Sequence, residues 1–589
     1  MKNENEISLE IKRHSLSHVM AAAVKELYPE AKFAIGPAID NGFYYDIDFG
    51  DNKITNDDFK TIEKKMSFLL KQNLKFERRE EDIDSALENA RKNEETYKIE
   101  LLNDLKKEGV KQVSLYKLGN FEDLCRGPHV DNTNKIKAGS FKLDKLAGAY
   151  WRGDENNKML TRIYGLAFED KEELNEYLNL VKEAEKRDHR KLGKELDLFC
   201  FSDLVGSGLP MFTPKGVTII DELRYHIEAV CREYGFEKVI TPHLAKIDLY
   251  EISGHAKKFS DELFRVSSLK GHNFVLKPVQ CPHQTQIYAS RQRSYKDLPI
   301  RYMESEKQYR AEKTGEVGGL SRVYAITVED GHSFCTVDQV KQEIINMVNI
   351  IKEFYSALGL WGNHWVSLSV RDYDHPEKYI GETSDWDICE KMLEEISNEM
   401  GLEAKRQEGE AALYGPKLDF MFRDSLGKEI QIPTVQVDFA TPKRFNLSYT
   451  DNDGQEKPPV MVHRAILGSY ERFLALLIEH FAGAFPLWLS PVQIKLISVS
   501  ETHGPACLKI ANKFKEEGIR VEVDNSNETV ANKIRKATQE KVPHLLVIGD
   551  KEASGDVLSV RDRGSRDTRE ISLPDFIKEV KDKIKNKIV

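Results

Sequence analysis

The most informative stretch of the chain reads Tyr309-Arg-Ala-Glu-Lys-Thr-Gly-Glu-Val-Gly-Gly-Leu-Ser-Arg-Val-Tyr-Ala-Ile-Thr-Val-Glu-Asp-Gly-His332. It places Arg310 and Glu312 before a glycine-rich turn and Arg322 after it, and then continues as a β-branched run typical of a strand. Guanidinium groups held on strands bind phosphate oxygens in fixed forks and stack on planar bases. A single arginine in such a place is more often a surface ion pair, so the flanking sequence must distinguish the two interpretations.

The regions on either side of this stretch favour a nucleotide site. Upstream, apolar residues at helical spacing between Gly216 and Gly235 predict an amphipathic helix that leads into a strand ending at Pro242. Downstream, Gly468-Ser-Tyr-Glu-Arg472 opens a long apolar helix that stops before Pro486. Three arginines in this order, between a helix–strand opening and a helix that starts at glycine, indicate a nucleoside triphosphate site.

A second group of polar residues lies near the N-terminus. His14 and His18 fall on one face of a predicted helix, and Cys125 and His129 flank a Gly-Pro turn. A zinc protease motif would need a glutamate directly after His14, where the chain has Ser15, so this class of enzyme is a poor match. Two such clusters in one region indicate a hydrolytic or a metal site, and two unrelated pairs of structural residues remain the alternative.

The rest of the chain separates into segments of different composition. A strand-like run covers Gly42–Asp48, charged residues at helical spacing predict solvated helices from Thr55 to about Leu105, and Leu174–Leu198 is typical of a linker helix. Residues 490–589 alternate strand, helix, strand, helix and strand, which predicts a small α/β domain. This segment carries 19 Lys and Arg against 16 Asp and Glu in a chain whose net charge is −10. It is therefore a candidate for binding a polyanion, with an ordinary solvated surface as the alternative.

Length and composition restrict the class of protein. The 589 residues predict about three to five domains. No stretch approaches the roughly 18 apolar residues of a membrane span, and the charged start Met1-Lys-Asn-Glu-Asn-Glu-Ile7 is unlike a secretory signal. The seven cysteines are odd in number and scattered without a CxxC motif, which favours a reducing compartment over a disulfide framework. We therefore expect a cytoplasmic protein with no membrane contact.

Together these motifs resemble those of class II aminoacyl-tRNA synthetases, and more closely those of the threonyl-tRNA synthetase family. The helix and strand before Pro242, Arg310 with Glu312, and Gly468 with Arg472 are similar to motifs 1, 2 and 3 of the class. The resemblance covers essentially the whole chain. It also rests on the stretches His14-Ser-Leu-Ser-His18, Ile35-Gly-Pro-Ala-Ile-Asp-Asn-Gly-Phe-Tyr-Tyr-Asp46, Cys125-Arg-Gly-Pro-His129, Ala147-Gly-Ala-Tyr-Trp-Arg-Gly-Asp154, Tyr414-Gly-Pro-Lys417, His463-Arg-Ala-Ile-Leu-Gly-Ser469 and Val547-Ile-Gly-Asp-Lys-Glu552.

The resemblance implies a multidomain fold of the α+β and α/β classes. It comprises an N-terminal α+β editing domain, a catalytic domain on the antiparallel sheet of class II synthetases, and a C-terminal α/β anticodon-binding domain. The expected boundaries are 1–135 for the first part of the editing domain, 136–198 for its remainder and the linker helix, 199–488 for the catalytic domain and 489–589 for the anticodon-binding domain. The family's N-terminal TGS domain is expected to be missing from this chain.

For the catalytic domain the resemblance implies activation of L-threonine by ATP, with Mg²⁺ on the nucleotide, and transfer to the 3′ end of tRNA(Thr). Arg310 is expected on the α-phosphate, Arg472 on the γ-phosphate and the adenine face, Arg322 on the tail of the triphosphate and Glu312 on the adenine amino group. The residues expected around the amino acid are Asp330, Tyr414, Lys417, Gln436 and Ser469.

The resemblance also implies one Zn²⁺ ion per subunit, held by Cys281, His332 and His463. Spacings of 51 and 131 residues carry no metal signature by themselves, and Cys335 is a rival ligand on sequence grounds. Zinc with three protein ligands can take up the amino group and the β-hydroxyl of threonine, whereas valine offers no hydroxyl. The chain departs from the family at Pro282-His283-Gln284, where Pro-Gly-His is usual, and at Ile326 and Val328, where an aromatic residue and a Gln are usual.

Serine also carries an amino group and a β-hydroxyl, and the methyl group that it lacks is worth only about 1–3 kcal/mol. The resemblance therefore implies hydrolytic editing of Ser-tRNA(Thr), without a metal, by His14, His18, Lys98, Asp123, Cys125 and His129.

The resemblance further implies that Glu552 and Arg561 read the tRNA anticodon, that Lys533 and Lys551 contact phosphate, and that the first motif forms a homodimer. Ordinary core is the alternative for the apolar face of that motif. Two other function classes stay open: a non-catalytic paralogue that regulates by binding RNA, and an editing-only hydrolase.

Overall fold

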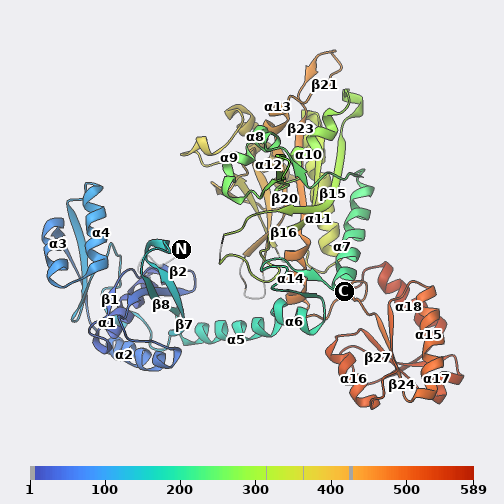
Figure 1. Ribbon diagram of the computed structural model, residues 1–589, viewed down its shortest axis with the longest axis horizontal. Helices are drawn as coiled ribbons and strands as arrows, with labels where there is room; N and C mark the ends of the chain where they lie inside the picture. Colours follow the sequence, from blue (N-terminus) through green and yellow to red (C-terminus); the bar gives the residue numbers. More distant parts are fainter. Residues whose placement is uncertain (1–6, 314, 363, 424–426, 428) are drawn as a thin grey trace. The chain divides into compact units, whose positions relative to one another are not determined.

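The structure, a computed structural model, describes residues 7–313, 315–362, 364–423, 427 and 429–589 (Figure 1). The chain divides into two compact units, Met1–Lys182 and Glu183–Val589. The boundary falls within helix α5, Lys171–Arg187, and a second helix, α6, His189–Glu195, follows it. The expected linker helix is therefore present but interrupted at Asp188, whose side chain accepts a hydrogen bond from Arg190 N–H and caps α6. The first six residues, on which the argument against a secretory signal rests, lie outside the described residues.

The first unit is built on a five-stranded sheet against which helix α1 packs. The helix starts after Ser8, whose hydroxyl accepts from Ile11 N–H, and it carries the two histidines that were expected on one helical face. The sheet has the order β1-β3-β8-β7, with β2 paired to β3. The elements are α1 (Leu9–Leu27), β1 (Lys32–Phe33), β2 (Ala38–Ile39), β3 (Gly42–Asp48), α2 (Phe59–Lys71), β7 (Phe141–Tyr150) and β8 (Met159–Ala167).

A smaller sheet of three strands, in the order β4-β5-β6, completes the first unit. Its edge strand β4, Phe76–Asp82, lies inside the region that was expected to be wholly helical. That prediction was wrong here because β4 is a solvated edge strand with four consecutive exposed residues, and charge at helical spacing does not distinguish such a strand from a solvated helix. The remaining elements are α3 (Ile83–Lys92), α4 (Thr96–Lys107), β5 (Gln112–Leu118) and β6 (Phe121–Leu124).

The second unit is organised around an eight-stranded sheet of order β11-β15-β16-β23-β20-β19-β17-β18. Neighbouring strands are antiparallel except at the two ends, where β11 runs parallel to β15 and β18 runs parallel to β17. The antiparallel sheet expected for the catalytic domain is thus confirmed. Its strands are β11 (Glu237–Lys238), β15 (Ile300–Tyr309), β16 (Ala325–Cys335), β17 (His364–Val370), β18 (Lys405–Glu408), β19 (Lys417–Arg423), β20 (Glu429–Asp438) and β23 (Val460–Ser469).

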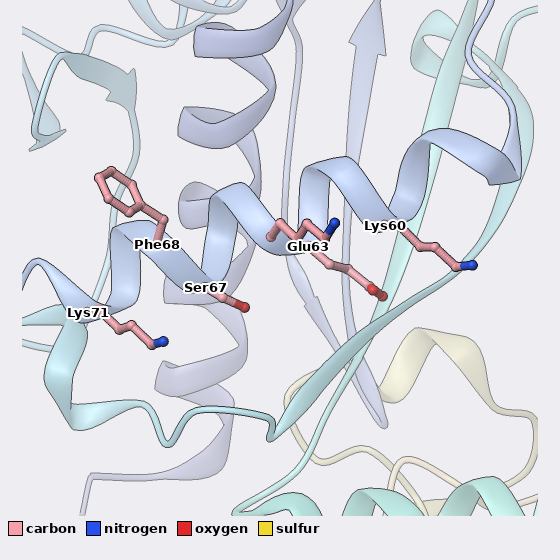
Figure 2. Close-up of a pocket in the computed structure, with 6 residues that line it drawn as sticks. Lys60, Glu63, Ser67, Phe68 and Lys71 are labelled. Carbon is pink, nitrogen blue, oxygen red and sulfur yellow. The ribbon is translucent and has the colours of Figure 1, made fainter.

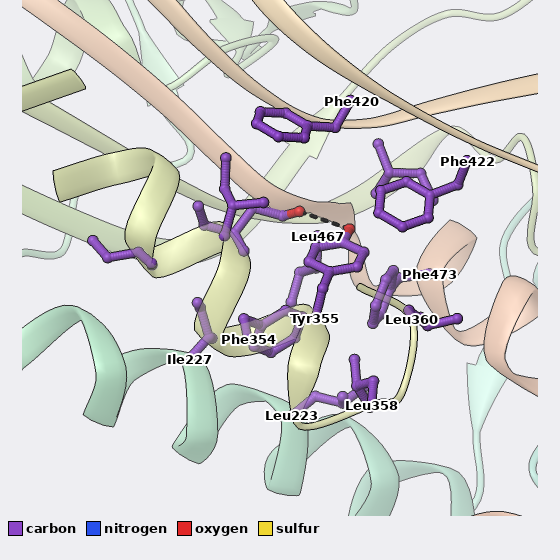
Figure 3. Packing of buried hydrophobic residues seen from close by; sticks show 14 of the residues in the cluster. Leu223, Ile227, Phe354, Tyr355, Leu358, Leu360, Phe420, Phe422, Leu467 and Phe473 are labelled. Atoms are coloured by element: carbon purple, nitrogen blue, oxygen red, sulfur yellow. Dashed lines mark hydrogen bonds between the residues drawn. The ribbon is translucent and has the colours of Figure 1, made fainter. Parts of the chain in front are cut away.

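Three helices, α7 (Pro214–Glu233), α11 (Val340–Ser356) and α14 (Tyr470–His480), form the main core with one face of this sheet. Figure 3 shows Leu223 and Ile227 of α7 next to Phe354 and Tyr355 of α11. The Tyr355 hydroxyl donates to the backbone carbonyl of Ile466 in β23 at 3.0 Å, which ties the helix to the sheet. The apolar face of α7 is therefore buried within this chain, as the core interpretation predicts.

Short elements surround the other face of the sheet, and one of them, α10, begins at Cys281. The other short elements of this part of the chain are β9 (Phe199–Cys200), β10 (Met211–Phe212), β12 (Leu244–Ala245), α8 (Ile247–Ser253), α9 (His255–Lys258), β13 (Arg265–Ser267), β14 (Asn273–Leu276), α10 (Cys281–Ala289), α13 (Ala440–Arg444), β21 (Tyr449–Thr450) and β22 (Glu456–Lys457). A longer helix, α12 (Thr383–Glu399), packs against α11 and adds Cys389, Leu393 and Ile396 to the main core.

The last hundred residues form a separate five-stranded sheet of order β25-β24-β26-β27-β28. Strand β24 runs parallel to β25 and β26, as a strand–helix alternation requires, and β27 and β28 are antiparallel additions that the sequence pattern did not predict. The elements are β24 (Ile494–Ser498), α15 (Gly504–Glu516), β25 (Val521–Asp524), α16 (Val530–Gln539), β26 (His544–Ile548), α17 (Asp550–Ser554), β27 (Val557–Asp562), β28 (Arg569–Ser572) and α18 (Leu573–Lys585).

Candidate functional sites

The register of the large sheet brings four polar residues from distant parts of the sequence into one row. Lys417 is paired with Gln436, Gln436 with His463, and His463 with His332. Directly opposed residues of antiparallel strands point to the same face, so these four side chains share one face of the sheet. Their neighbours along β19, β20 and β23 belong to the helix-covered core, which places the row on the opposite face.

Helix α10 adds Cys281 to this row. One ligand atom each from Cys281, His332 and His463 lies within 4.8 Å of the others, and all three residues are buried. The rival Cys335 belongs to the helix-covered core, where its thiol lies 3.7 Å from the Val460 carbonyl. Side chains alternate along β16, so Cys335 points to the face opposite to that of His332.

The donor set of this cluster fits a zinc ion. His332 Nδ1 contacts Gln284 at 2.8 Å, and its buried Nε2 has no hydrogen-bond partner among the described residues. His463 Nε2 contacts Asp438 at 3.0 Å, which leaves Nδ1 for a metal. Burial raises the pKa of the Cys281 thiol well above its ordinary value and lowers the pKa of His332 well below it. A cation bound here would favour a thiolate and neutral imidazoles, which is the set that zinc takes.

The expected amino-acid pocket surrounds the cluster. The Tyr414 ring stacks on the His463 ring at 4.6 Å, and the Tyr414 hydroxyl donates to Gln436 at 2.6 Å. Lys417 forms an ion pair with Asp419 at 2.7 Å. Burial, and then the nearby Glu329, raise the pKa of Asp330 to about 7. The structure therefore brings these pocket residues together with the three cluster residues.

The predicted nucleotide residues lie at the ends of β15, β16 and β23. Arg310 follows β15, and its backbone N–H donates to the Tyr324 carbonyl at 2.9 Å. Arg322 forms an ion pair with Glu312 at 2.6 Å, so these two groups that were expected to bind the nucleotide contact each other. Arg472 is in the first turn of α14, where its N–H donates to the capping residue Ser469 at 3.2 Å. Desolvation and then the charge of Arg322 lower the pKa of Arg472, so the two guanidinium groups are electrostatically coupled.

The register also places Val328 and Ile326, the two positions where the resemblance led us to expect a Gln and an aromatic residue. Val328 is paired with Ser469 across β23, and Ile326 is paired with Gln308 across β15. Alternation along β16 puts both side chains on the same face as His332. Apolar side chains therefore stand on the face of the sheet that carries the predicted nucleotide and amino-acid residues.

Sequence reasoning missed two groups that hold this region together. Glu471 accepts hydrogen bonds from Thr327 N–H and Oγ1, both at 2.8 Å, and pairs with Lys307 at 2.8 Å, which ties α14 to β15 and β16. His189 of α6 contacts Glu479 through Nδ1 at 2.7 Å and accepts the Leu320 N–H at 3.1 Å through Nε2. Neither group has a spacing signal, because each joins residues more than a hundred positions apart.

The second expected site lies in the first unit. His14, His18, Cys125 and His129 each offer an atom within 4.8 Å of the others. The Cys125 thiol lies 3.3 Å from Nε2 of both His14 and His129. Burial raises the pKa of Cys125 to about 11, and burial with the neighbouring imidazoles lowers the pKa of His129 to about 2. The cluster is therefore a set of neutral imidazoles and a protonated thiol near pH 7.

A buried charge network lies beside these histidines. Lys98 and Asp123 form an ion pair, and the Lys98 ammonium also donates to the Ala34 carbonyl at 2.9 Å. The Tyr45 hydroxyl donates to Asp123, whose carboxylate lies 3.7 Å from His18 Nδ1. Sequence analysis did not identify Tyr45 as a site residue, although it lies within one of the quoted family stretches. The six predicted residues of this site are thus brought together.

In the C-terminal domain, the four residues that were predicted to contact RNA lie in different environments, and one of them is buried. Glu552 accepts from Gly549 N–H and Ser559 Oγ, and Arg561 donates to the Ser565 carbonyl at 3.0 Å. The expectation that Lys533 contacts phosphate is wrong, because its side chain is buried and its ammonium donates to Ser498. Lys551 is exposed and forms an ion pair with Glu570.

A hollow lies along α2 of the first unit, and the described residues that line it belong to that helix (Figure 2). Phe68 is half exposed there, and the Glu63 carboxylate accepts the Leu143 N–H at 2.7 Å. None of the predicted site residues lines it. No helix among the described residues is long and apolar enough to cross a membrane.

Comparison with known proteins gives three family matches. Residues 264–481 match the tRNA synthetase class II core domain (G, H, P, S and T), residues 492–583 match the anticodon binding domain, and residues 113–164 match the threonyl and alanyl tRNA synthetase second additional domain.

Two curated relatives illustrate the similarity along nearly the whole chain. The threonine–tRNA ligase of Cytophaga hutchinsonii is 45% identical over 566 residues, which is 96% of this chain and 87% of the relative. That of Clostridium tetani is 44% identical over 577 residues, 98% of this chain and 88% of the relative.

Solved structures agree with this similarity. The RNA binding domain of threonyl-tRNA synthetase from Cryptosporidium parvum is 32% identical, with a TM-score of 0.63, and the match covers 67% of this chain and 98% of that one. A prolyl-tRNA synthetase of Giardia lamblia, at 16% identity and a TM-score of 0.54, covers 70% of this chain and 81% of that one and shares the fold alone.

Proposed function

The chain belongs to the threonine–tRNA ligase family, and on that premise we propose that it activates L-threonine with ATP and transfers it to tRNA(Thr). A carboxylate oxygen of threonine attacks the α-phosphorus, the bond to the pyrophosphate oxygen breaks, and threonyl-adenylate forms. The 3′-terminal hydroxyl of the tRNA then attacks the carbonyl carbon, and AMP leaves. The observation that carries this proposal is the row of Lys417, Gln436, His463 and His332 on one sheet face, with Cys281 beside it.

The arginines of this chain stabilise charge in the first step. Arg310 binds the α-phosphate, where negative charge develops, while Arg322 and Arg472 bind the departing pyrophosphate part. Glu312 orients the adenine amino group by accepting a hydrogen bond from it. Magnesium on the triphosphate supplies further neutralisation of the phosphate oxygens.

The cluster of Cys281, His332 and His463 would hold the zinc ion, one per subunit. Such an ion is a Lewis acid with an open position for the amino group and the β-hydroxyl of threonine. The surrounding residues then orient the substrate: Asp330 accepts from its polar groups, and Tyr414, Gln436 and Lys417 close the pocket around it. A pocket that binds the hydroxyl rejects valine, because its own polar groups would stay unpaired.

We propose that the second cluster removes serine from tRNA(Thr) by hydrolysis. His14, His18 and His129 are held neutral by burial, so their ring nitrogens can accept hydrogen bonds from a water molecule near the ester. Cys125 stays a protonated thiol and acts as a contact rather than as a nucleophile. The ion pair of Lys98 and Asp123 positions His18 and the 3′ adenosine.

The remaining assignments follow the family. We propose the domain boundaries 1–135, 136–198, 199–488 and 489–589, with editing, linker, catalytic and anticodon-binding roles as expected above. Glu552 and Arg561 read anticodon bases through their side chains, because base-specific RNA contacts need splayed bases with hydrogen-bonding partners. Two copies of the chain form a homodimer, whose mass in sedimentation would be twice the 67.6 kDa of one chain.

Threonine-dependent exchange of pyrophosphate into ATP tests the proposal. The parent protein is expected to exchange with threonine and not with valine, and R310A is expected to lose about 10²–10³-fold of the rate because one charge-stabilising donor is gone. The matched control is R291A, which removes an exposed arginine of the same unit outside the site. Absence of exchange in the parent protein would contradict the activity, and deacylation of Ser-tRNA(Thr) by that same protein would indicate an editing-only hydrolase.

A further inference from the structure

A buried hydrogen-bond chain stands behind one of the three candidate zinc ligands. It runs from His332 through Gln284 to Glu304, and all three side chains are almost completely shielded from solvent. Gln284 lies one helical turn after Cys281 in α10, so the helix that supplies one ligand also supplies the contact to another.

The contacts of Glu304 show that its carboxylate accepts hydrogen bonds. Thr241 donates to it through its backbone N–H at 2.6 Å and through its hydroxyl at 2.9 Å. The Lys277 ammonium, itself fully buried, lies 3.5 Å away and also donates to the Thr241 hydroxyl at 3.1 Å. Because two neutral donors and a buried cation surround it, the Glu304 carboxylate acts as a hydrogen-bond acceptor.

An acceptor at this position determines which way the Gln284 amide points. Its NH₂ group contacts Glu304 at 3.4 Å, because a carboxylate cannot donate. The carbonyl oxygen of the amide must then be the atom that lies 2.8 Å from His332 Nδ1. A carbonyl accepts only, so Nδ1 carries the imidazole proton and the lone pair is on Nε2.

His332 Nε2 is the atom that faces the cluster. It is buried and has no hydrogen-bond partner among the described residues. Asp330 Oδ1 lies 3.9 Å away, beyond hydrogen-bond distance, so the lone pair on Nε2 is free for a metal. His463 is oriented by a different device, since a carboxylate, Asp438, contacts its Nε2. Asp438 is held in turn by the backbone N–H groups of Ala440 and Thr441, both at 2.8 Å.

We infer that Gln284 is a positioning residue for the metal: with Glu304, Thr241 and Lys277 behind it, its amide holds His332 in the tautomer and orientation that present Nε2 to zinc. The inference rests on the proposed zinc site and deepens it. Partners that orient a metal-binding histidine typically change metal affinity or activity 10- to 100-fold when they are removed. Gln284 thus tunes how tightly this chain holds zinc without touching the ion.

The test is the dissociation constant for Zn²⁺ of the full-length protein, measured by competition with a chromophoric chelator. Q284M keeps the volume but removes the acceptor, and we expect its affinity for Zn²⁺ to fall 10- to 100-fold. Q286M is the matched control on the same helix, because Gln286 is exposed and its amide donates to the neighbouring Thr285 hydroxyl rather than to a cluster residue, and we expect less than a twofold change. The KM for threonine should rise in Q284M while the KM for ATP stays constant.

A second variant keeps the test decisive if Q284M does not fold. In Q284E a side-chain oxygen still accepts from His332 Nδ1, and the buried Lys277 ammonium beside Glu304 offsets part of the added negative charge. We expect Q284E to retain zinc affinity within about threefold of the parent, since the acceptor is what matters. The unfolding midpoints of the metal-free proteins report whether each variant is folded.

The possible failures are distinguishable. Zinc affinity equal to the parent in folded Q284M, an equal loss in Q286M, or a tenfold loss in folded Q284E would each overturn the positioning role and leave the proposed zinc site intact. A parent protein that binds no zinc, with C281A behaving identically, would overturn the zinc site and this inference with it.

Discussion

Removing Arg464 alone should destabilise the catalytic sheet far more than removing it together with its partner Glu329. Arg464 follows the candidate ligand His463 on β23, and its guanidinium donates two hydrogen bonds to Glu329, at 2.7 and 2.8 Å. Their side chains are 0% and 1% exposed, and the guanidinium also lies 4.5 Å from the Phe236 ring. Among the described residues, no other side chain or backbone N–H donates to the Glu329 carboxylate.

The magnitude follows from this geometry. R464M strips the carboxylate of both donors and leaves a buried negative charge without a partner, which costs about 3–5 kcal/mol of the free energy of unfolding. The double variant E329M/R464M replaces the pair by apolar groups of similar length and is expected within about 1–2 kcal/mol of the parent. The double variant is therefore expected to be more stable than R464M by about 2–3 kcal/mol.

Urea unfolding followed by tryptophan fluorescence measures this difference. Four of the five tryptophans lie in the second unit and only Trp151 lies in the first, so the signal mainly reports the unit that carries the pair. The control is K581M, which breaks an exposed ion pair with Glu517 and should cost no more than about 1 kcal/mol. A loss below about 1 kcal/mol in R464M, or a double variant as unstable as the single one, would refute the reasoning.

Three further predictions concern the proposed sites. C281A should lose stoichiometric zinc while C335A keeps it, because only the first thiol belongs to the cluster; metal analysis of both purified proteins checks this. The first unit should lose stability as the pH falls from 7 to 5. Burial lowers the pKa of His129 to about 2, so the unfolded chain takes up a proton below about pH 6.5 that the folded chain does not, and this imidazole alone removes about 2 kcal/mol; amide hydrogen exchange of the helices and strands of the first unit at the two pH values measures this loss. R561A should weaken charging of tRNA(Thr) and leave threonine-dependent pyrophosphate exchange near the parent rate, and equal losses in both assays would place Arg561 outside RNA recognition.

The candidate zinc site shows what a sequence alone can provide. Spacings of 51 and 131 residues between the three ligands contain no pattern, because the strand register that unites them is a property of the folded sheet. The family resemblance supplied the residues, and the register supplies the reason that His332 and His463 meet. The role of Gln284 could not be predicted, since it depends on the direction of one buried amide.

Local patterns predicted local elements well and their surroundings less well. The apolar spacing of α7 and the strand–helix alternation of the C-terminal domain are both present in the structure. The charged strand β4 and the buried Lys533 were misread for one common reason. Composition reports that a residue is charged, whereas the hydrogen bonds that pair an edge strand or bury an ammonium depend on residues far away in sequence.

Strand β23 lies between β16 and β20 in the finished sheet, yet it is the last of the eight strands to be synthesised. Until it leaves the ribosome, β11-β15-β16 and β20-β19-β17-β18 are separate half-sheets, each with an unpaired edge that can join another chain. At about 5–20 residues per second, the interval between the end of β16 and the end of β23 lasts about 7–27 s. A ribosome that pauses within this interval should therefore raise the aggregated fraction of newly made chains, although the stability of the completed protein is unchanged.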